Sequence, residues 1–361
     1  MSLSILAKKA CVGVDIGHKF IKIVQVDRSG PVWKLIAWTH VPTPSDSVKE
    51  GQILDSDAVG LAIKTALKEA KINASHANIS VAGGSVIVRN ARVPKMTDAT
   101  LRKSIRYEAA RYVPASIEDS FIDFEIRGTA PDGQMEVQIV AAPKTLVNSR
   151  IRACQIADLK VDAVDIETFA MHRTIVESDE SSALNSMTVA LIDVGAMTTT
   201  VSVVLRGMFT MSRTIPHGGQ TLTEALKAYF KLTDADAESG KGQLDLNPLL
   251  QEREMDNPPL RVLQPHVDDL VREIRRSLNY YQSQQSEAGH SDPVTHLVIA
   301  GGGARLGGLT SYFSHKLGIP SICRGVLDHP RIVAPAGLTD SSGMEFTVAA
   351  GLAMKPNDKA A

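Results

Sequence analysis

At 361 residues the chain is longer than one hydrophobic core normally grows, so its length predicts roughly two to four packed units. Its 43% hydrophobic and 22% charged residues are typical of an ordinary soluble protein, and the formal net charge of -1 argues against a nucleic-acid partner. Three widely spaced cysteines, Cys11, Cys154 and Cys323, form no C-x-x-C pair and argue against a disulfide framework or a zinc site.

The two ends of the chain carry no membrane signal. MSLSILAKKACVGVDIG contains an apolar piece too short for a secretion signal, and no later stretch reaches the roughly 18 apolar residues of a membrane-spanning helix. The C-terminal MKPNDKAA is polar and contains proline, which argues against an amphipathic anchor. We therefore expect a cytoplasmic protein.

The first predicted element is a hairpin that begins with Asp-x-Gly. VGVDIGHKFIKIVQV places Asp15 and Gly17 between two alternating apolar runs, and a third run closes at Pro42. A helix pattern, DAVGLAIKTALKEAKI, follows it, and then a short strand that ends in glycines, HANISVAGG at 76–84.

The same order returns in the second half of the chain. LIDVGAMTTTVSVV places Asp193 and Gly195 at the corresponding turn, and its hairpin closes at Pro216. The helix VDDLVREIRRSLNYYQSQ and the glycine-ended strand THLVIAGGG at 295–303 complete the copy. Two such copies predict an α/β fold of duplicated ribonuclease H-like domains that face each other across a ligand-binding cleft.

Two insertions interrupt the repeat. One lies between the halves and predicts a strand, a helix, two strands around Pro131-Asp132-Gly133 and another helix; the other follows the second hairpin. The expected divisions are 1–88 and 166–190 for the first half with its connection, 89–165 for the first insert, 191–216 and 263–335 for the second half, 217–262 for the small second insert, and 336–361 for a C-terminal helix that returns to the first half and a polar tail.

The Asp-x-Gly turns have a chemistry of their own. An Asp at the end of a strand, followed by a glycine turn, sets a carboxylate beside backbone N–H donors that can bind phosphate, while the carboxylate holds Mg²⁺ through water. Two facing turns would clamp a triphosphate, and Gly301 to Gly303 would let a base and ribose lie on bare backbone. A Rossmann fingerprint would need glycine at Leu306, and SGKGQ is not a Walker A sequence.

At these motifs the sequence resembles the actin, sugar kinase and Hsp70 superfamily and, within it, the PilM family of type IV pilus assembly proteins, relatives of the cell-division protein FtsA. The resemblance covers nearly the whole chain and implies an actin-like fold. It rests on VDIGHKFIKIV, IDVGAMTTTVSVV with RTIPHGGQTLTEAL, EIRRSLNYYQSQ, LVIAGGGARLGGL and FTVAAGLAMK. The stretch YEAARYVPASIEDSFIDFEI makes the first insert similar to the FtsA-type extra subdomain.

The resemblance implies ATP and Mg²⁺ as ligands. Asp15 and Asp193 would hold the metal through water. Lys22 matches a lysine that contacts phosphates, with a solvated charge on an exposed strand face as the alternative. For Glu238 and Lys241 the alternative to a ligand contact is a charged pair on the solvent-facing side of a helix. Where the family usually has small hydroxyl residues after the first D-I-G, this chain has His18 and Lys19. The implied nucleotide contacts are Asp15, Gly17, His18, Lys19, Lys22, Asp193, Gly195, Ala196, Met197 and Thr198 around the phosphates, Glu238 and Lys241 at the purine or ribose, and Gly301, Gly302 and Gly303 at the adenosine.

No catalytic residue is assigned from the sequence. Glu167 in DIETFAMHR is the nearest candidate for orienting a water molecule, and a plain helix-terminal carboxylate is the alternative. At most slow ATPase activity is therefore expected.

The resemblance implies a cytoplasmic ATP-binding scaffold of pilus assembly. Its partner would be the N-terminal cytoplasmic tail of a PilN-like inner-membrane protein, which would hold it at the inner face of that membrane, and pilus motor ATPases would be further partners. An active kinase or ATPase of the same superfold, or an FtsA-like division protein, remain alternatives. The FtsA-type insert favours the scaffold, and the polar C-terminus argues against the division protein.

The partner tail is expected to dock beside the first insert. LRKSIRYEAARYVP presents an apolar stripe at helical spacing, which could either face the partner or pack the insert's own sheet. An insert of three strands or fewer also leaves a strand edge, to which an extended tail can add main-chain hydrogen bonds. The stripe consists of Leu101, Ile105, Ala109 and Tyr112.

Overall fold

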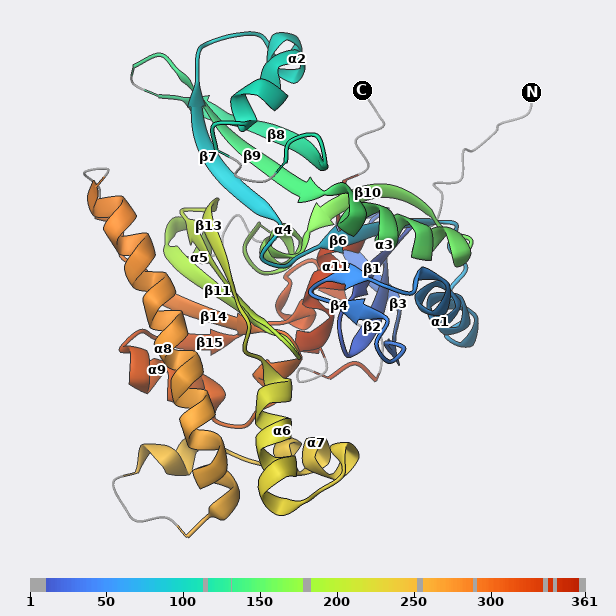
Figure 1. The fold of residues 1–361 in the computed structure, drawn as a ribbon, viewed down its shortest axis with the longest axis vertical. Helices are drawn as coiled ribbons and strands as arrows, with labels where there is room; N and C mark the ends of the chain where they lie inside the picture. Colours follow the sequence, from blue (N-terminus) through green and yellow to red (C-terminus); the bar gives the residue numbers. More distant parts are fainter. Residues whose placement is uncertain are drawn as a thin grey trace.

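The computed structural model describes residues 11–112, 116–130, 132–177, 183–251, 256–287, 291–333, 337–339 and 343–356. Pro131 of the expected turn and the expected polar tail at 357–361 lie outside these ranges. Two large sheets form the two halves of the molecule, and a small third sheet projects from the first half (Figure 1). No helix within the described ranges has the length and hydrophobicity to span a bilayer.

The first half is built on a six-stranded mixed sheet. The hairpin β1–β2 forms at the first Asp-x-Gly motif, β3 continues antiparallel, and β6 and β10 add in parallel on the other side of β1. Helices α1 (Ser56–Glu69) and α3 (Lys144–Ile156) pack together on one face. In spatial order the strands are β10 (Lys160–Ile166), β6 (His76–Val81), β1 (Cys11–Ile16), β2 (Phe20–Asp27), β3 (Trp33–Pro42) and β16 (Ile332–Val333).

The second half repeats this plan with five strands. Its outer face packs on α6 (Gly219–Phe230), the long α8 (Pro258–Glu287) and α9 (Leu309–Leu317). Its inner face packs on α4 (Glu167–His172) and α11 (Thr347–Ala353), which thus lie between the two sheets. In spatial order the strands are β13 (Met208–Ile215), β12 (Thr199–Leu205), β11 (Thr188–Val194), β14 (His296–Ala300) and β15 (Ser321–Cys323).

The strand orders confirm the predicted duplication. Reading from the hairpin outward, β3-β2-β1-β6-β10 in the first half corresponds to β13-β12-β11-β14-β15 in the second. Within each hairpin the two aspartates occupy the same register position, with Asp15 opposite Lys22 and Asp193 opposite Thr200. The remaining elements are β4 (Val48–Lys49), β5 (Gln52–Ile53), α5 (Ala183–Ser186), α7 (Asp234–Gly242), a π-helical turn η1 (Arg173–Glu177), and the 3-10 turns η2 (Asn247–Leu250), η3 (Gly302–Arg305), η4 (Val326–Asp328) and η5 (Met344–Phe346).

The first insert folds as a separate three-stranded sheet with one helix. Its order is β7 (Ile87–Val93), β9 (Met135–Pro143) and β8 (Ser120–Thr129), and α2 (Asp98–Ala109) covers one face. The expected range 89–165 is too long. β10 pairs with β6 in the first main sheet, and α3 packs on α1 against that sheet, so the separately folded part ends near Pro143. The short β16 likewise pairs with β3 of the first half, although 263–335 was expected in the second.

The apolar stripe of α2 packs inside the insert. Leu101, Ile105 and Ala109 are buried against β8 and β9, and Tyr112 packs beside them with its hydroxyl donating to the carbonyl of Arg92 at 3.2 Å. The structure therefore supports the interpretation in which this stripe packs the insert's own sheet.

The insert also contacts the second half of the molecule. The Gln138 amide, on the sheet face opposite α2, donates to the carbonyl of Phe209 at 3.2 Å, and Asn90 donates to the carbonyl of Thr210 at 3.3 Å. Both acceptors lie on β13, next to the hairpin turn between β12 and β13. The insert thus bridges the two halves on the side where β13 lies (Figure 1).

The C-terminal helix α11 packs closely on its neighbours because glycines stand at two of the contacts. A Cβ on Gly13 of β1 would lie 1.9 Å from the carbonyl oxygen of Ala349, and one on Gly351 would lie 1.9 Å from that of Ala170 in α4. No real Cβ tolerates such distances. Close packing between the two sheets therefore requires glycine at both positions.

We expect Gly351→Ala to destabilise the protein by about 3 kcal/mol or more, because α11 would have to move away from α4. Gly240→Ala is the matched control, since its Cβ would meet nothing within 4 Å and alanine favours the helix α7. Chemical denaturation measures both. A Gly351→Ala protein as stable as the wild type would show that α11 does not pack as described.

Candidate functional site

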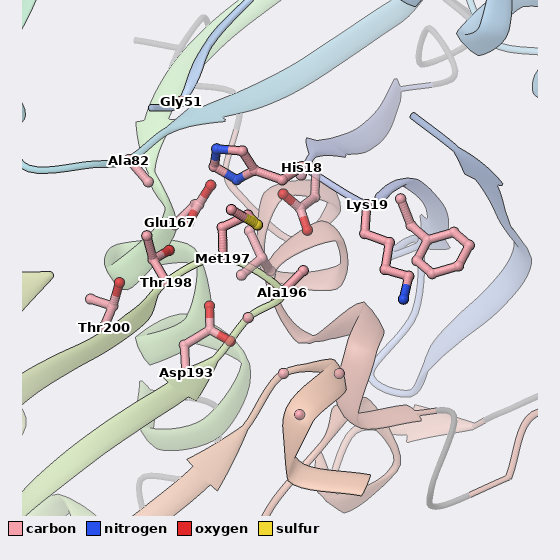
Figure 2. Close-up of a pocket in the computed structure, with 18 of the residues that line it drawn as sticks. His18, Lys19, Gly51, Ala82, Glu167, Asp193, Ala196, Met197, Thr198 and Thr200 are labelled. Atoms are coloured by element: carbon pink, nitrogen blue, oxygen red, sulfur yellow. The ribbon is translucent and has the colours of Figure 1, made fainter. Parts of the chain in front are cut away.

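A cavity of about 550 Å³ lies between the two halves (Figure 2). Both Asp-x-Gly turns, the start of α4, the glycine turn after β14, and the first residues of η5 and of α11 contribute to its walls. Of the residues proposed from the sequence, only Lys241 does not line it. Those that do are Asp15, Gly17, His18, Lys19, Lys22, Glu167, Asp193, Gly195, Ala196, Met197, Thr198, Glu238, Gly301, Gly302 and Gly303.

The two turns have the same backbone geometry. The Gly17 N–H donates to the carbonyl of Phe20 at 3.1 Å, and the Gly195 N–H donates to the carbonyl of Thr198 at 2.9 Å. A Cβ on either glycine would lie within about 3 Å of that carbonyl oxygen, at 3.0 Å and 2.9 Å. Glycine therefore closes each turn tightly.

The N-terminus of helix α6 is hydrogen-bonded to the second turn. Its first N–H groups, those of Gly219 and Gln220, donate to the carbonyls of Gly195 and Ala196 at 2.9 and 2.8 Å. A Cβ on Gly218 would lie 2.6 Å from both carbonyl oxygens, so the HGG sequence lets the helix approach this closely. The carbonyls of Gly195 and Ala196 are thereby occupied by the helix.

One ion pair dominates the floor of the cavity. The Lys22 ammonium lies 2.8 Å from the buried carboxylate of Asp15. Burial alone would lower the pKa of Lys22, but the carboxylates of Asp15, Asp193 and Glu167 together raise that pKa above its usual value. Lys22 is thus firmly charged, as a phosphate-binding or charge-balancing lysine must be.

Two further carboxylates face this pair. Burial, opposed by Lys22 and aided by Asp15, raises the pKa of Asp193 from an ordinary 3.8 to about 6. Glu167, at the start of α4, has its pKa raised by burial and then by Asp15, with Arg150 acting in the opposite direction. In Figure 2 the His18 ring lies on the same side as Glu167 and Ala82, whereas the Lys19 side chain extends away from them.

The three glycines after β14 have different roles. Gly301 has a φ of +86°, and a Cβ there would lie 2.2 Å from an Asp193 carboxylate oxygen. A Cβ on Gly303 would lie 2.4 Å from the Val194 side chain, whereas one on Gly302 would meet nothing within 4 Å. Gly301 and Gly303 therefore allow the turn to approach β11, and Gly302 alone leaves open space at the cavity wall.

A charged cluster joins the two halves at the mouth of the cavity. The Glu238 carboxylate of α7 accepts from Lys19 at 2.9 Å, from Lys241 at 2.8 Å and from the Thr223 hydroxyl at 2.6 Å. Burial opposes, but the bonds from Lys241, Thr223 and Lys19 outweigh it and lower the pKa of Glu238 to about 2. Lys241 also donates to the carbonyl of Gly219 at 3.1 Å, which occupies its ammonium behind the cavity wall.

Several cavity residues have no signal in the sequence. Arg150 comes from α3, and Glu345 from the approach to α11, far along the chain from either Asp-x-Gly turn. Glu345 accepts from His40 at 3.1 Å and pairs with Arg305 at 3.6 Å. Arg305 lies two residues after the last glycine of the turn, so the extended motif GGGAR could have predicted it as a cavity residue.

The residues present fit Mg²⁺ and a nucleotide. The tight turns present N–H groups, Gly302 leaves bare backbone, and an anionic floor faces the cavity. Among the described residues no three His, Cys, Asp or Glu side chains form a cage for direct coordination of a metal. Asp15 and Asp193 would therefore hold a cation largely through water and phosphate oxygens, as Mg²⁺ prefers.

Comparison with known proteins finds similarity over nearly the whole chain. A family model described as type IV pilus assembly protein PilM matches residues 13–357. The solved PilM-PilN type IV pilus biogenesis complex aligns with 25% identity and a TM-score of 0.80, over 95% of this chain and 97% of the other. MreB 5 of Spiroplasma citri bound to AMPPNP aligns with 12% identity and a TM-score of 0.50, over 95% of each chain.

Curated relatives are cell-division proteins. FtsA of Bacillus subtilis (strain 168) is 24% identical over 261 residues, which cover 64% of this chain and 57% of that protein. FtsA of Neisseria meningitidis serogroup B is 21% identical over 316 residues, which cover 77% and 74% respectively. The chain thus spans little more than half of the first of these relatives. The expected actin-like α/β fold is confirmed.

We expect Asp193→Asn to stabilise the nucleotide-free protein while weakening Mg–ATP binding. Because the folded pKa of Asp193 is raised, the unfolded chain loses its proton first as pH rises from about 4, and folding becomes less favourable until about pH 6. Removing the charge should therefore add about 1–3 kcal/mol at pH 7.5 and clearly less at pH 5. Denaturant titrations at both pH values measure the gain, and a variant less stable than the wild type at pH 7.5 would contradict it.

A bulky side chain at Gly302 tests whether the open cavity wall is used by the nucleotide. Gly302→Leu should raise the dissociation constant for Mg–ATP more than tenfold, because the side chain would occupy the open cavity wall, yet leave the melting temperature within about 2 °C. Isothermal titration calorimetry and a thermal melt test the two halves of this statement. Unchanged affinity in a folded Gly302→Leu protein would place the nucleotide elsewhere.

Proposed function

Because the chain belongs to the type IV pilus assembly protein PilM family, whose model spans residues 13–357, we propose that it is an ATP-binding scaffold of the pilus assembly machine. The observation that carries this proposal is the likeness to the PilM-PilN complex over 95% of the chain, insert included. ATP and Mg²⁺ would bind in the cavity between the halves, since the turns, the glycine wall and the carboxylates that this ligand needs all line it.

The proposed partner is a PilN-like inner-membrane protein. Its N-terminal cytoplasmic tail would bind this chain and hold it at the inner face of the membrane. In the similar solved complex PilM is paired with PilN, and that pairing supports a partner of the same kind here. Pilus motor ATPases are proposed as further partners of the scaffold.

Within the insert, the edge of β8 is the best docking place for an extended tail. β9 is paired on both sides, β7 lies against β13, and within the described ranges β8 has a neighbour in the sheet on one side only. Phe121 and Ile126 on β8 are 46% and 40% exposed. An added strand could satisfy the main-chain groups along this edge while its apolar side chains cover these two.

ATP turnover, if present, would be slow. Glu167 is the carboxylate proposed to orient a water molecule, and burial and Asp15 raise its pKa, which favours the protonated form in the absence of ligand. A protonated acid is a poor general base. The nucleotide is thus better suited to fixing the relation of the two halves than to supplying rapid chemistry.

The insert can be removed without cutting the main sheet. Ile87 and Ala141 are paired across β7 and β9, so a short turn can join them in place of residues 88–140. We expect the shortened protein to bind Mg–ATP but to lose binding of the N-terminal cytoplasmic peptide of its PilN-like partner. Fluorescence anisotropy with a labelled peptide measures the loss.

A point variant sharpens this experiment. Phe121→Glu should weaken the peptide about tenfold or more, because it places a charge on the proposed apolar contact. Tyr229→Glu is the matched control, since Tyr229 is an exposed aromatic residue on α6 in the second half. Full peptide affinity in the folded, shortened protein would rule out the insert as the docking place.

A further inference from the structure

An ion pair between the two halves crosses the mouth of the cavity. Lys19 belongs to the first Asp-x-Gly turn, in the first half, and Glu238 to α7 in the small insert of the second. The Lys19 ammonium lies 2.9 Å from the Glu238 carboxylate. In Figure 2 the Lys19 side chain extends away from Glu167 and Ala82. Both partners line the cavity with 34% and 40% of their side chains exposed, so the pair stands where the cavity meets solvent.

The Glu238 carboxylate is held in place by its own half of the molecule. It accepts from the Lys241 ammonium at 2.8 Å and from the Thr223 hydroxyl at 2.6 Å, and Lys241 is itself anchored to the carbonyl of Gly219 at 3.1 Å. Burial alone would raise the pKa of this carboxylate, but the bonds from Lys241, Thr223 and Lys19 lower it to about 2, so it is charged at physiological pH. Only the Lys19 side chain therefore has to be ordered when the pair forms.

The halves are joined in two different ways around the cavity. Beside the glycine turn, the Gly301 N–H donates to the carbonyl of Met344 at 3.2 Å, so the main chain that leads into α11 is tied directly to the second half. Across the mouth, Lys19 and Glu238 meet through the ends of two side chains. Rotation of the Lys19 side chain breaks this link without disturbing a strand or a helix. The ion pair is thus the link that a ligand can part.

The strength of the pair suits a contact that opens and closes. Ion pairs between partly exposed side chains are weak, because water and salt screen their charges and because ordering a long side chain costs entropy. A deeply buried pair would instead close the cavity lastingly, since its partners cannot separate without leaving a charge unpaired in the interior. A weak pair across the mouth delays a passing ligand and does not block it.

We propose that the ion pair between Lys19 and Glu238 is a gate at the mouth of the cavity, which must open for a nucleotide to enter or leave and so limits the rate of exchange. This inference rests on the proposed nucleotide function and deepens it. It gives Lys19 and Glu238 a role in exchange, beyond the contacts with phosphate and ribose that the sequence predicts for them.

The test measures the rates of entry and release in the full chain by stopped-flow fluorescence, with Mg²⁺ and the N-methylanthraniloyl derivative of ATP, chased by unlabelled ATP. Lys19→Met removes one charge of the pair but keeps a long side chain, and Glu238→Gln removes the other charge. Each should raise both rates about threefold at low salt and leave the dissociation constant within about twofold, because a gate acts on entry and release alike.

The two substitutions change the net charge of the site in opposite directions. An effect of the site's electric field on an anionic ligand would therefore differ in sign between Lys19→Met and Glu238→Gln, whereas loss of a gate has the same sign in both. The double variant should exchange no faster than either single variant, since all three lack the same contact. Lys227→Met is the matched control, because it breaks an ion pair with Asp234 that does not line the cavity, and both rates should stay unchanged.

The other outcomes separate the gate from the nucleotide function. Effects of opposite sign, effects that multiply in the double variant, or rates equal to those of the wild type would overturn the gate and leave ATP binding standing. Wild-type protein without a saturable signal would overturn the proposed function together with it. If Glu238→Gln fails to fold because Lys241 loses its partner, the salt dependence of Lys19→Met decides: salt should accelerate release less in this variant than in the wild type, and an equal acceleration would contradict the gate.

Discussion

Three carboxylates and two cations line one cavity where the halves of the molecule meet. Asp15, Glu167 and Asp193 face the same cavity, and Lys22 and Arg150 are the cations that allow them to do so. Without these cations the like charges would repel one another and take up protons. All five ionised would carry one net negative charge, and the raised pKa of Glu167, which favours its neutral form, brings the free site closer to neutral. The cations thus offset most of the repulsion between the carboxylates that line the cavity.

This balance also explains why the duplicated halves are not equivalent. Both contribute an Asp-x-Gly turn with the same backbone bonds, yet the residue opposite the aspartate is Lys22 in one half and Thr200 in the other. The first half, with its connection to the second, supplies both cations and two of the three carboxylates. The second supplies the N-terminus of α6 behind its turn and the glycine wall after β14. A charged group and a preorganised backbone thus face each other across one ligand site.

The repeated strand order and the two turns could be predicted from the sequence because their signals are local: alternating apolar residues, an Asp at the end of a strand and a glycine where the chain must turn. Arg150 could not be predicted, because its position depends on how α3 packs on α1, which lies about 80 residues earlier in the chain, a separation that no short pattern encodes. The same long-range packing explains the end of the insert. β10 has no local feature that assigns it to β6 instead of to the nearer β9.

Single residues show the same limit. Lys241 carries a charge that could contact a ligand, but its ammonium already donates to Glu238, Thr223 and the carbonyl of Gly219. Gly301 and Gly303 were expected at the adenosine, and the structure gives both of them a close approach to β11 as well. A sequence shows which residues can perform a task, whereas the competing partners appear only in three dimensions.

Binding across both halves is the central claim, and amide hydrogen exchange of the full chain with and without Mg–ATP tests it most directly. We predict that Mg–ATP slows exchange together in three segments, 15–20, 194–198 and 301–304, which come from opposite walls of the cavity. Slowing confined to one half, or exchange unchanged in all three segments at saturating Mg–ATP, would contradict it.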